Sequence, residues 1–176
     1  MSKSFKNYNE EIDAIKREIN ELAVRLDEIR KIQADLDYTQ EESPALDKCR
    51  KDIKPFDEFW KTYAEIEEKQ EYWLTTNVNE LDPEEVESKF KKLQRTFNNL
   101  EITFQTMRLG KLVNYAKNKK EFLAKFQKKI PVIKVLNTEG LKESHIAKMA
   151  KKLGLGEKTD ITRQPLSTME NAEQHI

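Results

Sequence analysis

The fold class of this chain is decided near its start, by the stretch FKNYNEEIDAIKREINELAVRLDEIRKIQADL, residues 5–36. Its apolar residues recur in alternating steps of three and four, interrupted only by Gln33: Phe5, Tyr8, Ile12, Ile15, Ile19, Leu22, Leu26, Ile29 and Leu36. Such steps place side chains on one face of an α-helix, and their repetition makes heptads. Glu11, Glu18 and Arg25 flank this face, as charged edge positions do. The pattern predicts a long helix, either a coiled-coil strand or one helix of a bundle.

The composition agrees with a helical protein. Of the 176 residues, 36% are charged, and 32 basic side chains balance 32 acidic ones. The apolar share is 37%, and the chain has only four glycines and five prolines. A many-turned β protein or a compact α/β enzyme needs more turn residues and more apolar surface. We therefore expect an all-α fold, an elongated helical bundle with a long, heptad-patterned helix at its N-terminus.

A second helix is expected after a loop between Asp37 and Pro44. Its apolar face should carry two tryptophans, Trp60 and Trp73, which we expect to be buried. Pro55 lies inside this series, so the helix either restarts or kinks there. The full face is Leu46, Cys49, Ile53, Phe56, Phe59, Trp60, Tyr63, Ile66 and Trp73.

The clearest helix start is Asp82-Pro83, where Asp82 is the expected N-cap and Glu85 can close a capping box. Gly110 is expected to end or interrupt this third helix. The apolar face of the third helix is Val86, Phe90, Leu93, Phe97, Leu100, Phe104 and Met107, and that of the fourth is Leu112, Tyr115, Phe122, Phe126 and Ile130, with Lys119 in one slot. A kinked helix is favoured over a strand for residues 130–136. A last short helix should carry Leu141, His145, Met149 and Leu153, with Gly154 at its C-cap.

No group of residues predicts catalysis, a cofactor or a metal site, so the expected set of site residues is empty. Cys49 is the only cysteine, which excludes an internal disulfide and a multi-thiolate metal site. It shares the apolar face of the second helix, so we expect it to be buried. His145 is expected on the apolar face of its helix, and His175 in the polar end of the chain. These side chains are interpreted as structural.

Two other patterns resemble catalytic ones without meeting their requirements. Residues 155–159 have the sequence Leu-Gly-Glu-Lys-Thr, whereas a phosphate-binding loop needs Gly-Lys-Ser/Thr in direct succession. Carboxylates gather at residues 41–42 and 84–87, in a loop and at a helix start, where solvated negative charge is favourable. The chain is therefore predicted not to be an enzyme.

Several partner classes are also excluded. No run approaches the roughly 20 apolar residues that span a bilayer, and the first residues lack the apolar core of a signal peptide. We therefore expect a cytosolic protein without a membrane partner. Nothing in the sequence is typical of a groove-reading or base-stacking module, so nucleic acid is not an expected partner.

Charge is distributed unevenly along the chain. Residues 1–107 carry 17 basic and 25 acidic side chains, whereas residues 108–153 carry 13 basic and only 3 acidic ones. The lysines of this basic block either pair with acidic residues of the same molecule or dock onto an acidic protein surface. Both alternatives remain open at this point.

The order of several segments resembles one region of the dynein heavy chains. Residues 53–60 (Ile-Lys-Pro-Phe-Asp-Glu-Phe-Trp), a second tryptophan at Trp73, and the Leu-Asp-Pro-Glu-Glu-Val start at residues 81–86 are similar to the N-terminal linker region of that family. Residues 126–137 and 141–146 resemble two elements that follow there. Ser144 and Ile146 depart from the family, which has Arg and Trp beside this histidine.

The resemblance implies a non-catalytic fragment of a dynein motor heavy chain, from its tail-to-linker region. Such an arm transmits ATP-driven conformational change in microtubule-based movement. Its partners would be the ATPase ring and tail of the same heavy chain and other dynein subunits, with docking through the basic block 108–153. The resemblance favours an axonemal type, hence a cytoskeletal location in a cilium or flagellum. The alternative is an independent coiled-coil or spectrin-like scaffold.

This interpretation divides the chain into three parts. Residues 1–37 form the coiled-coil-like helix, and residues 38–153 form a helical bundle of the linker type. Residues 154–176 form a polar, weakly ordered end or the start of a further helix. Pro55, Gly110 and Pro131 are the expected points at which such an arm bends.

Overall fold

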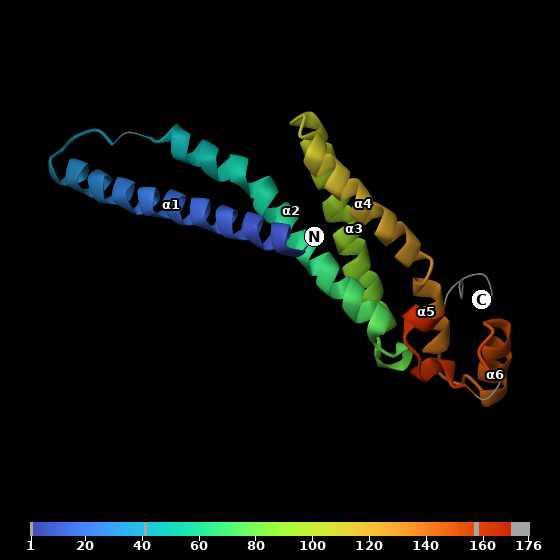
Figure 1. The fold of residues 1–176 in the computed structure, drawn as a ribbon. Coiled ribbons are helices and arrows are strands. Elements are labelled where there is room, and N and C mark those ends of the chain that lie inside the picture. Colours follow the sequence, from blue (N-terminus) through green and yellow to red (C-terminus); the bar gives the residue numbers. More distant parts are fainter. Residues whose placement is uncertain (1, 41, 157–158, 170–176) are drawn as a thin grey trace. The chain divides into compact units, whose positions relative to one another are not determined.

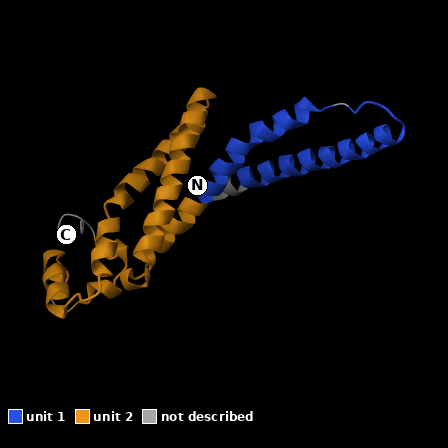
Figure 2. Cartoon of the chain, turned by 180° about the vertical axis from the view of Figure 1, so that it is seen from behind, with its two compact units in different colours: residues 1–64 blue, residues 65–176 orange. Residues whose placement is uncertain are grey.

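The fold is known from a computed structural model that describes residues 2–40, 42–156 and 159–169. Every regular element in these ranges is a helix, and their only β-type pairing is an isolated bridge between Asn77 and Pro165 (Figure 1). The all-α fold class is thus confirmed. The chain divides into two compact units, unit 1 (residues 1–64) and unit 2 (residues 65–176), and the division falls within one helix, α2 (Figure 2).

Unit 1 is a helical hairpin. The long first helix is confirmed as α1 (Ser2–Asp35), and after a loop the chain continues in α2 (Pro44–Thr75). The parts of α1 and α2 in unit 1 lie side by side and run in opposite directions in both views. Pro55 lies inside α2 without ending it, so the helix does not restart there.

A ring stack and an ion pair join α1 to α2 in unit 1. The ring of Tyr8 stacks on Trp60 with centroids 4.6 Å apart. The Lys16 ammonium donates to both carboxylate oxygens of Asp57 at 3.1 Å, and Lys61 donates to the same carboxylate at 2.9 Å. Burial acts to raise the pKa of Asp57, but the hydrogen bonds from Lys61 and Lys16 outweigh it and lower that pKa. The carboxylate therefore remains charged between α1 and α2.

The buried face of α2 lies to one side of the predicted one. Trp60 and Trp73 are buried, as expected, together with Phe59 and Ile66. Four other predicted members of the face are only half-buried: Leu46, Ile53, Phe56 and Tyr63. Cys49 is exposed. The sevenfold series Phe59, Ile66 and Trp73, which sequence reasoning treated as an extension, is therefore the centre of the face.

Unit 2 begins with the end of α2, a 3₁₀ turn η1 (Val78–Glu80) and α3 (Pro83–Thr106). The predicted start of α3 is confirmed, because the Asp82 carboxylate accepts from the backbone N–H groups of Glu84 and Glu85, at 2.8 and 3.2 Å. Its predicted apolar face is buried from Val86 to Phe104, whereas the terminal Met107 is 42% exposed. Three phenylalanines at sevenfold spacing form its centre: Phe90, Phe97 and Phe104.

The next helix is α4 (Gly110–Gln127), which packs along α3 as a hairpin. Gly110 starts α4, and the left-handed residue of the turn is Arg108, with φ 58°. The predicted face of α4 was displaced by one residue, because its buried side chains are those one position later: Val113, Ala116 and Leu123. Tyr115 is 36% exposed. Phe126 belongs to both faces and is buried.

Two short helices follow. Residues 130–136 form a helix as favoured, α5 (Ile130–Leu136), with Pro131 in its first turn. The second of them is α6 (Glu143–Lys152). Gly154 follows it with φ 72°, and the N–H of Leu155 donates to the carbonyl of Ala150 at 2.9 Å. This is the Schellman geometry that a glycine permits, and it confirms the predicted C-cap.

Residues 159–169 pack into unit 2 although their sequence has no helical period. They form two 3₁₀ turns, η2 (Ile161–Arg163) and η3 (Leu166–Thr168). The side chains of Ile161, Leu166 and Met169 are buried. The N–H of Val78 donates to the carbonyl of Gln164 at 3.2 Å, which ties this segment to η1.

Candidate docking surface

Three lysines of the basic block are held by acidic side chains of unit 2. Lys120 donates to Glu101 at 2.5 Å and Lys134 donates to Glu87 at 2.6 Å. Lys119, which occupies a slot in the predicted face of α4, pairs with Glu67. Glu101 is buried, and Gln105 also donates to it at 3.2 Å, so its charge is compensated. These lysines bind α4 and α5 to neighbouring helices.

Glu87 is the acidic centre of the contact between α3 and α5. Hydrogen bonds from Lys134 and Lys91 lower the pKa of its carboxyl to about 2. Pro83, Asn137 and Thr138 line an open groove with the same three charged side chains. Because Glu87 is already paired with two ammonium groups, it is an anchor for α5 and makes a poor general base.

Other lysines of the block carry charge that no described side chain neutralises. On α4 and at its C-cap these are the exposed Lys111, Lys117, Lys125 and Lys128, and at α6 the exposed Lys142, Lys148 and Lys152. At 100° per residue, the first four fall within about one third of the helix circumference. We call these seven residues the docking lysines. Pairing within the molecule is therefore confirmed for Lys119, Lys120 and Lys134, whereas docking onto an acidic protein surface stays a prediction for the docking lysines.

The segments that resemble a known family lie at the structural junctions of unit 2. The Leu81–Val86 stretch forms the start of α3, with Leu81 buried. The stretch 126–137 covers the end of α4 and all of α5. At its end, the Asn137 amide donates to the carbonyl of Val78 and to that of Ile133, both at 2.9 Å. The motif residues thus hold α5 against η1.

A comparison with protein families agrees with these positions. Residues 46–174 match the family described as dynein heavy chain, N-terminal region 2. The chain belongs to this family.

The match spans α2 to the last described turn of this dynein heavy chain segment, whereas α1 precedes it. No curated protein and no solved structure matches the chain. The family is described as an N-terminal region of the heavy chain, which agrees with the prediction of a non-catalytic fragment.

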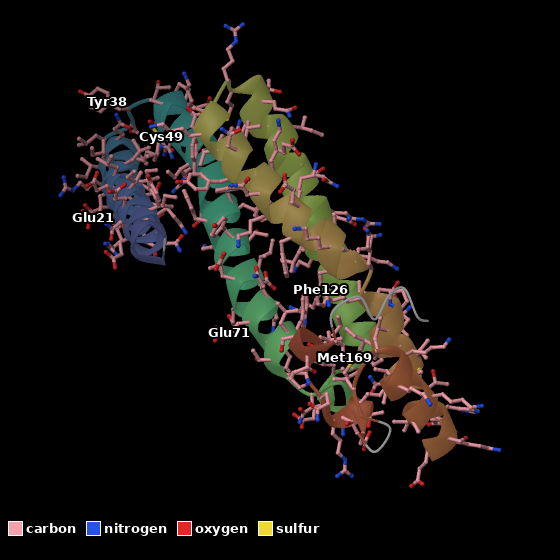
Figure 3. The ribbon with its side chains drawn as sticks, turned by 45° about the vertical axis from the view of Figure 1, so that its right-hand side comes forward. Glu21, Tyr38, Cys49, Glu71, Phe126 and Met169 are labelled. Carbon is pink, nitrogen blue, oxygen red and sulfur yellow. The ribbon has the colours of Figure 1, made fainter. Side chains whose placement is uncertain are left out.

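Two structural interpretations of single residues in the dynein segment were wrong. Cys49 was expected to be buried, but its side chain is exposed on α2 (Figure 3). His145 was expected on the apolar face of α6, but it is exposed, and the buried residue of that helix is Ala150. In both cases a step of three or four residues from an apolar neighbour was taken to indicate burial. The surface that packs against each helix covers fewer positions than the apolar pattern of that helix does.

None of the remaining candidate residues forms a binding or catalytic site within the part of the chain that the structure describes. Glu84 and Glu85 are exposed at the start of α3. His175, Glu41 and the Glu157-Lys158 pair of the loop-like stretch lie outside the described residues. Within the described ranges, no three His, Cys, Asp or Glu side chains are grouped to hold a metal ion. None of the helices described is both long and apolar enough to cross a membrane.

Proposed function

We propose that this dynein heavy chain segment is the tail-to-linker part of the molecule, a helical arm without catalytic groups of its own. In this proposal the arm transmits the ATP-driven conformational change of the ring to the tail during microtubule-based movement, at a cytoskeletal location. The observation that carries the proposal is the family match over residues 46–174. The resemblance to axonemal heavy chains extends the proposal to a location in a cilium or flagellum.

The packing of unit 2 supports a mechanical role. An arm transmits displacement only if its interior resists deformation, and close-packed protein cores have low compressibility. The core of unit 2 contains fully buried aromatic rings from two helices, with Phe97 and Phe104 from α3 and Phe126 from α4. The buried Glu101 and its pairing with Lys120 add a directional contact between the same helices.

The docking lysines supply a means of attachment. Their charge is uncompensated within the described residues, so an acidic protein surface gains Coulomb energy by approaching them. We assign this surface to the ATPase ring or tail of the same heavy chain, or to another dynein subunit. Lys119, Lys120 and Lys134 are excluded from this role because acidic residues of unit 2 bind them.

The mechanical role is tested in the full heavy chain that contains this segment. Phe97→Ala opens a cavity in unit 2 and should slow microtubule gliding while the ring retains its ATPase rate. Ile102→Ala, on the same helix but 62% exposed, is the matched control and should leave both rates unchanged. Normal gliding with Phe97→Ala, in a protein whose unit 2 is measurably destabilised, would contradict the force-transmitting role of the arm.

The docking role has its own test. The segment is titrated with the separately prepared ATPase ring of the same heavy chain, at low and at high salt. Lys125→Glu combined with Lys128→Glu should weaken binding about tenfold or more at low salt and much less at high salt. Lys92→Glu, an exposed lysine on α3 outside the docking lysines, is the control. Equal binding by all three proteins would exclude docking through this surface on the ring.

The absence of a catalytic role is tested by calorimetry with ATP and the segment alone. No heat of binding is expected, because the proposal places the nucleotide sites elsewhere in the heavy chain. A micromolar affinity for ATP would contradict the proposal.

A further inference from the structure

The apolar heptad face of α1 is only half covered within unit 1. Ile12 and Ile19 are 7% and 8% exposed. The positions three residues later in each heptad are open to solvent, at 39% for Tyr8, 44% for Ile15, 54% for Leu22, 52% for Ile29 and 62% for Leu36. We call these five residues the outer stripe. Ile12 and Ile19 of one row are therefore buried in the hairpin. In the other row Tyr8 stacks on Trp60, and the residues from Ile15 onward are exposed.

The outer stripe is regular along α1, and its last member, Leu36, directly follows the end of the helix. Its members follow each other at intervals of seven residues, and all are apolar or aromatic. Single exposed apolar residues are common on protein surfaces, but a continuous apolar row marks an interaction surface. Because a sevenfold row on a straight helix is the pattern of a coiled-coil seam, the missing partner is itself a helix.

We infer that the outer stripe packs against the outer stripe of a second copy of this chain, in antiparallel orientation. Two hairpins would then form a four-helix bundle around a two-fold axis at Leu22. This inference goes beyond the proposed function and does not depend on it. Two observations favour a second copy as the occupant: the spacing of the stripe and the charges at its edge.

The spacing makes the stripe complementary to itself. In an antiparallel pair centred on Leu22, this residue meets Leu22 of the second copy. Ile15 then lies opposite Ile29 of the second copy, and Tyr8 lies opposite Leu36. Every apolar residue of the stripe therefore faces another one, and both copies use the same surface, as an isologous interface requires.

The charges at the edge of the stripe select the antiparallel orientation. Glu11, Glu18 and Arg25 lie beside the stripe, and Glu18 and Arg25 are exposed without an ion pair to any described residue. In the antiparallel pair, Glu18 lies next to Arg25 of the second copy, and this contact occurs twice. In a parallel pair this edge of one helix would face the opposite edge of the second helix, so Glu18 and Arg25 would not meet.

Sedimentation equilibrium of the full chain tests the association. We expect the mass to rise from one chain to two with concentration. Leu22→Glu places two carboxylates at the two-fold axis and should raise the dimer dissociation constant about 30-fold or more, as loss of a central contact does. Val24→Glu is the matched control, since Val24 is 59% exposed on the same helix but points away from the stripe. It should change the constant by less than about threefold.

Disulfide trapping tests the orientation. In a Cys49→Ser background, which removes the only native thiol, Leu22→Cys should form a disulfide-linked dimer and Val24→Cys should not. Ile15→Cys should cross-link to Ile29→Cys in a mixture of the two proteins, but not to itself. A chain that stays monomeric at all concentrations overturns the inference. A dimer that Leu22→Glu does not weaken, or an Ile15→Cys homodimer, overturns it as well.

Discussion

Trp73 stacks on Phe126 with the ring centroids 4.7 Å apart and the ring planes 16° from parallel. The two residues come from the end of α2 and the end of α4, and both rings are almost fully buried. Phe90 approaches the same Phe126 ring at 6.2 Å. This aromatic cluster joins three helices of unit 2 at the point where the chain turns from α4 into α5.

Removing the tryptophan ring from this cluster should destabilise unit 2. Trp73→Ala is expected to lower the free energy of unfolding by about 3–5 kcal/mol, the range for a large aromatic residue truncated in a core. Urea denaturation followed by circular dichroism measures the loss. Tyr72→Ala is the control, because the adjacent ring is 47% exposed and should cost about 1 kcal/mol or less. Similar losses for the two variants would show that the ring at position 73 is not a core residue.

Trp60 should be equally sensitive, and part of its effect should come from Tyr8. Trp60→Ala is expected to cost about 3–5 kcal/mol, since the side chain is 4% exposed. A double-mutant cycle with Tyr8→Ala should give a coupling free energy of about 0.5–1.5 kcal/mol, because the rings stack. A loss below about 1 kcal/mol for Trp60→Ala would show that Trp60 is not a core residue. A coupling free energy near zero would show that the two rings do not stack in solution.

The stability of unit 1 should depend on pH through Asp57. Its pKa is lower in the folded state than in the unfolded chain. The carboxylate therefore contributes stability above the unfolded pKa near 4, and this contribution is lost as pH falls through the folded pKa. Asp57→Asn should cost roughly 1 kcal/mol at pH 7 and progressively less below about pH 4. A cost that stays constant between pH 7 and pH 3 would contradict the ion pairs with Lys16 and Lys61.

Glu87 should titrate far below an ordinary glutamate. Its pKa of about 2 is set by hydrogen bonds from Lys134 and Lys91, so its contribution to stability is present above the ordinary pKa and is lost between about pH 4.5 and pH 2. Carbon-detected NMR of the side-chain carboxyl gives the midpoint directly. Lys134→Met should raise it toward the ordinary value, whereas Lys92→Met, at an exposed lysine of α3, should not. Because the contact lies at the surface, high salt should also raise the midpoint.

Sequence reasoning was most accurate for α3. Asp82 and Pro83 define a start that the backbone follows because the carboxylate satisfies two free N–H groups. The apolar series behind them lies on one face without a competing series. The whole stripe up to Phe104 is therefore buried as the pattern predicts.

The same reasoning was less accurate for α4, since two apolar series run along this helix one residue apart. Leu112, Tyr115 and Phe122 are larger than Val113 and Ala116, and residue size favoured the first series. Ala116 is fully buried because its small side chain permits close approach of another helix. Periodicity gives the spacing of a face, but it does not show which of two adjacent series meets the neighbouring helix.

The candidate docking surface was predicted only as a block of charge. Counting residues 108–153 could not separate Lys120 or Lys134 from Lys125 or Lys128, because their partners Glu101 and Glu87 lie on α3. Likewise, the heptads of α1 predicted a single apolar face. The exposure of Ile15 and Leu22 beside the buried Ile12 and Ile19 depends on where α2 packs, which the local sequence does not encode.

The hydrogen bond from Val78 to Gln164 has a consequence for the order of events during synthesis. It joins the first turn of unit 2 to one of its last described segments, and the buried Ile161 and Leu166 lie in that same segment. A ribosome releases the chain from its N-terminus, so α3 and α4 can pair while this segment is still in the exit tunnel. Until residues 159–169 emerge, the Val78 N–H has only water as an acceptor. The apolar side chains of unit 2 against which Ile161 and Leu166 pack remain exposed to water and to chaperones.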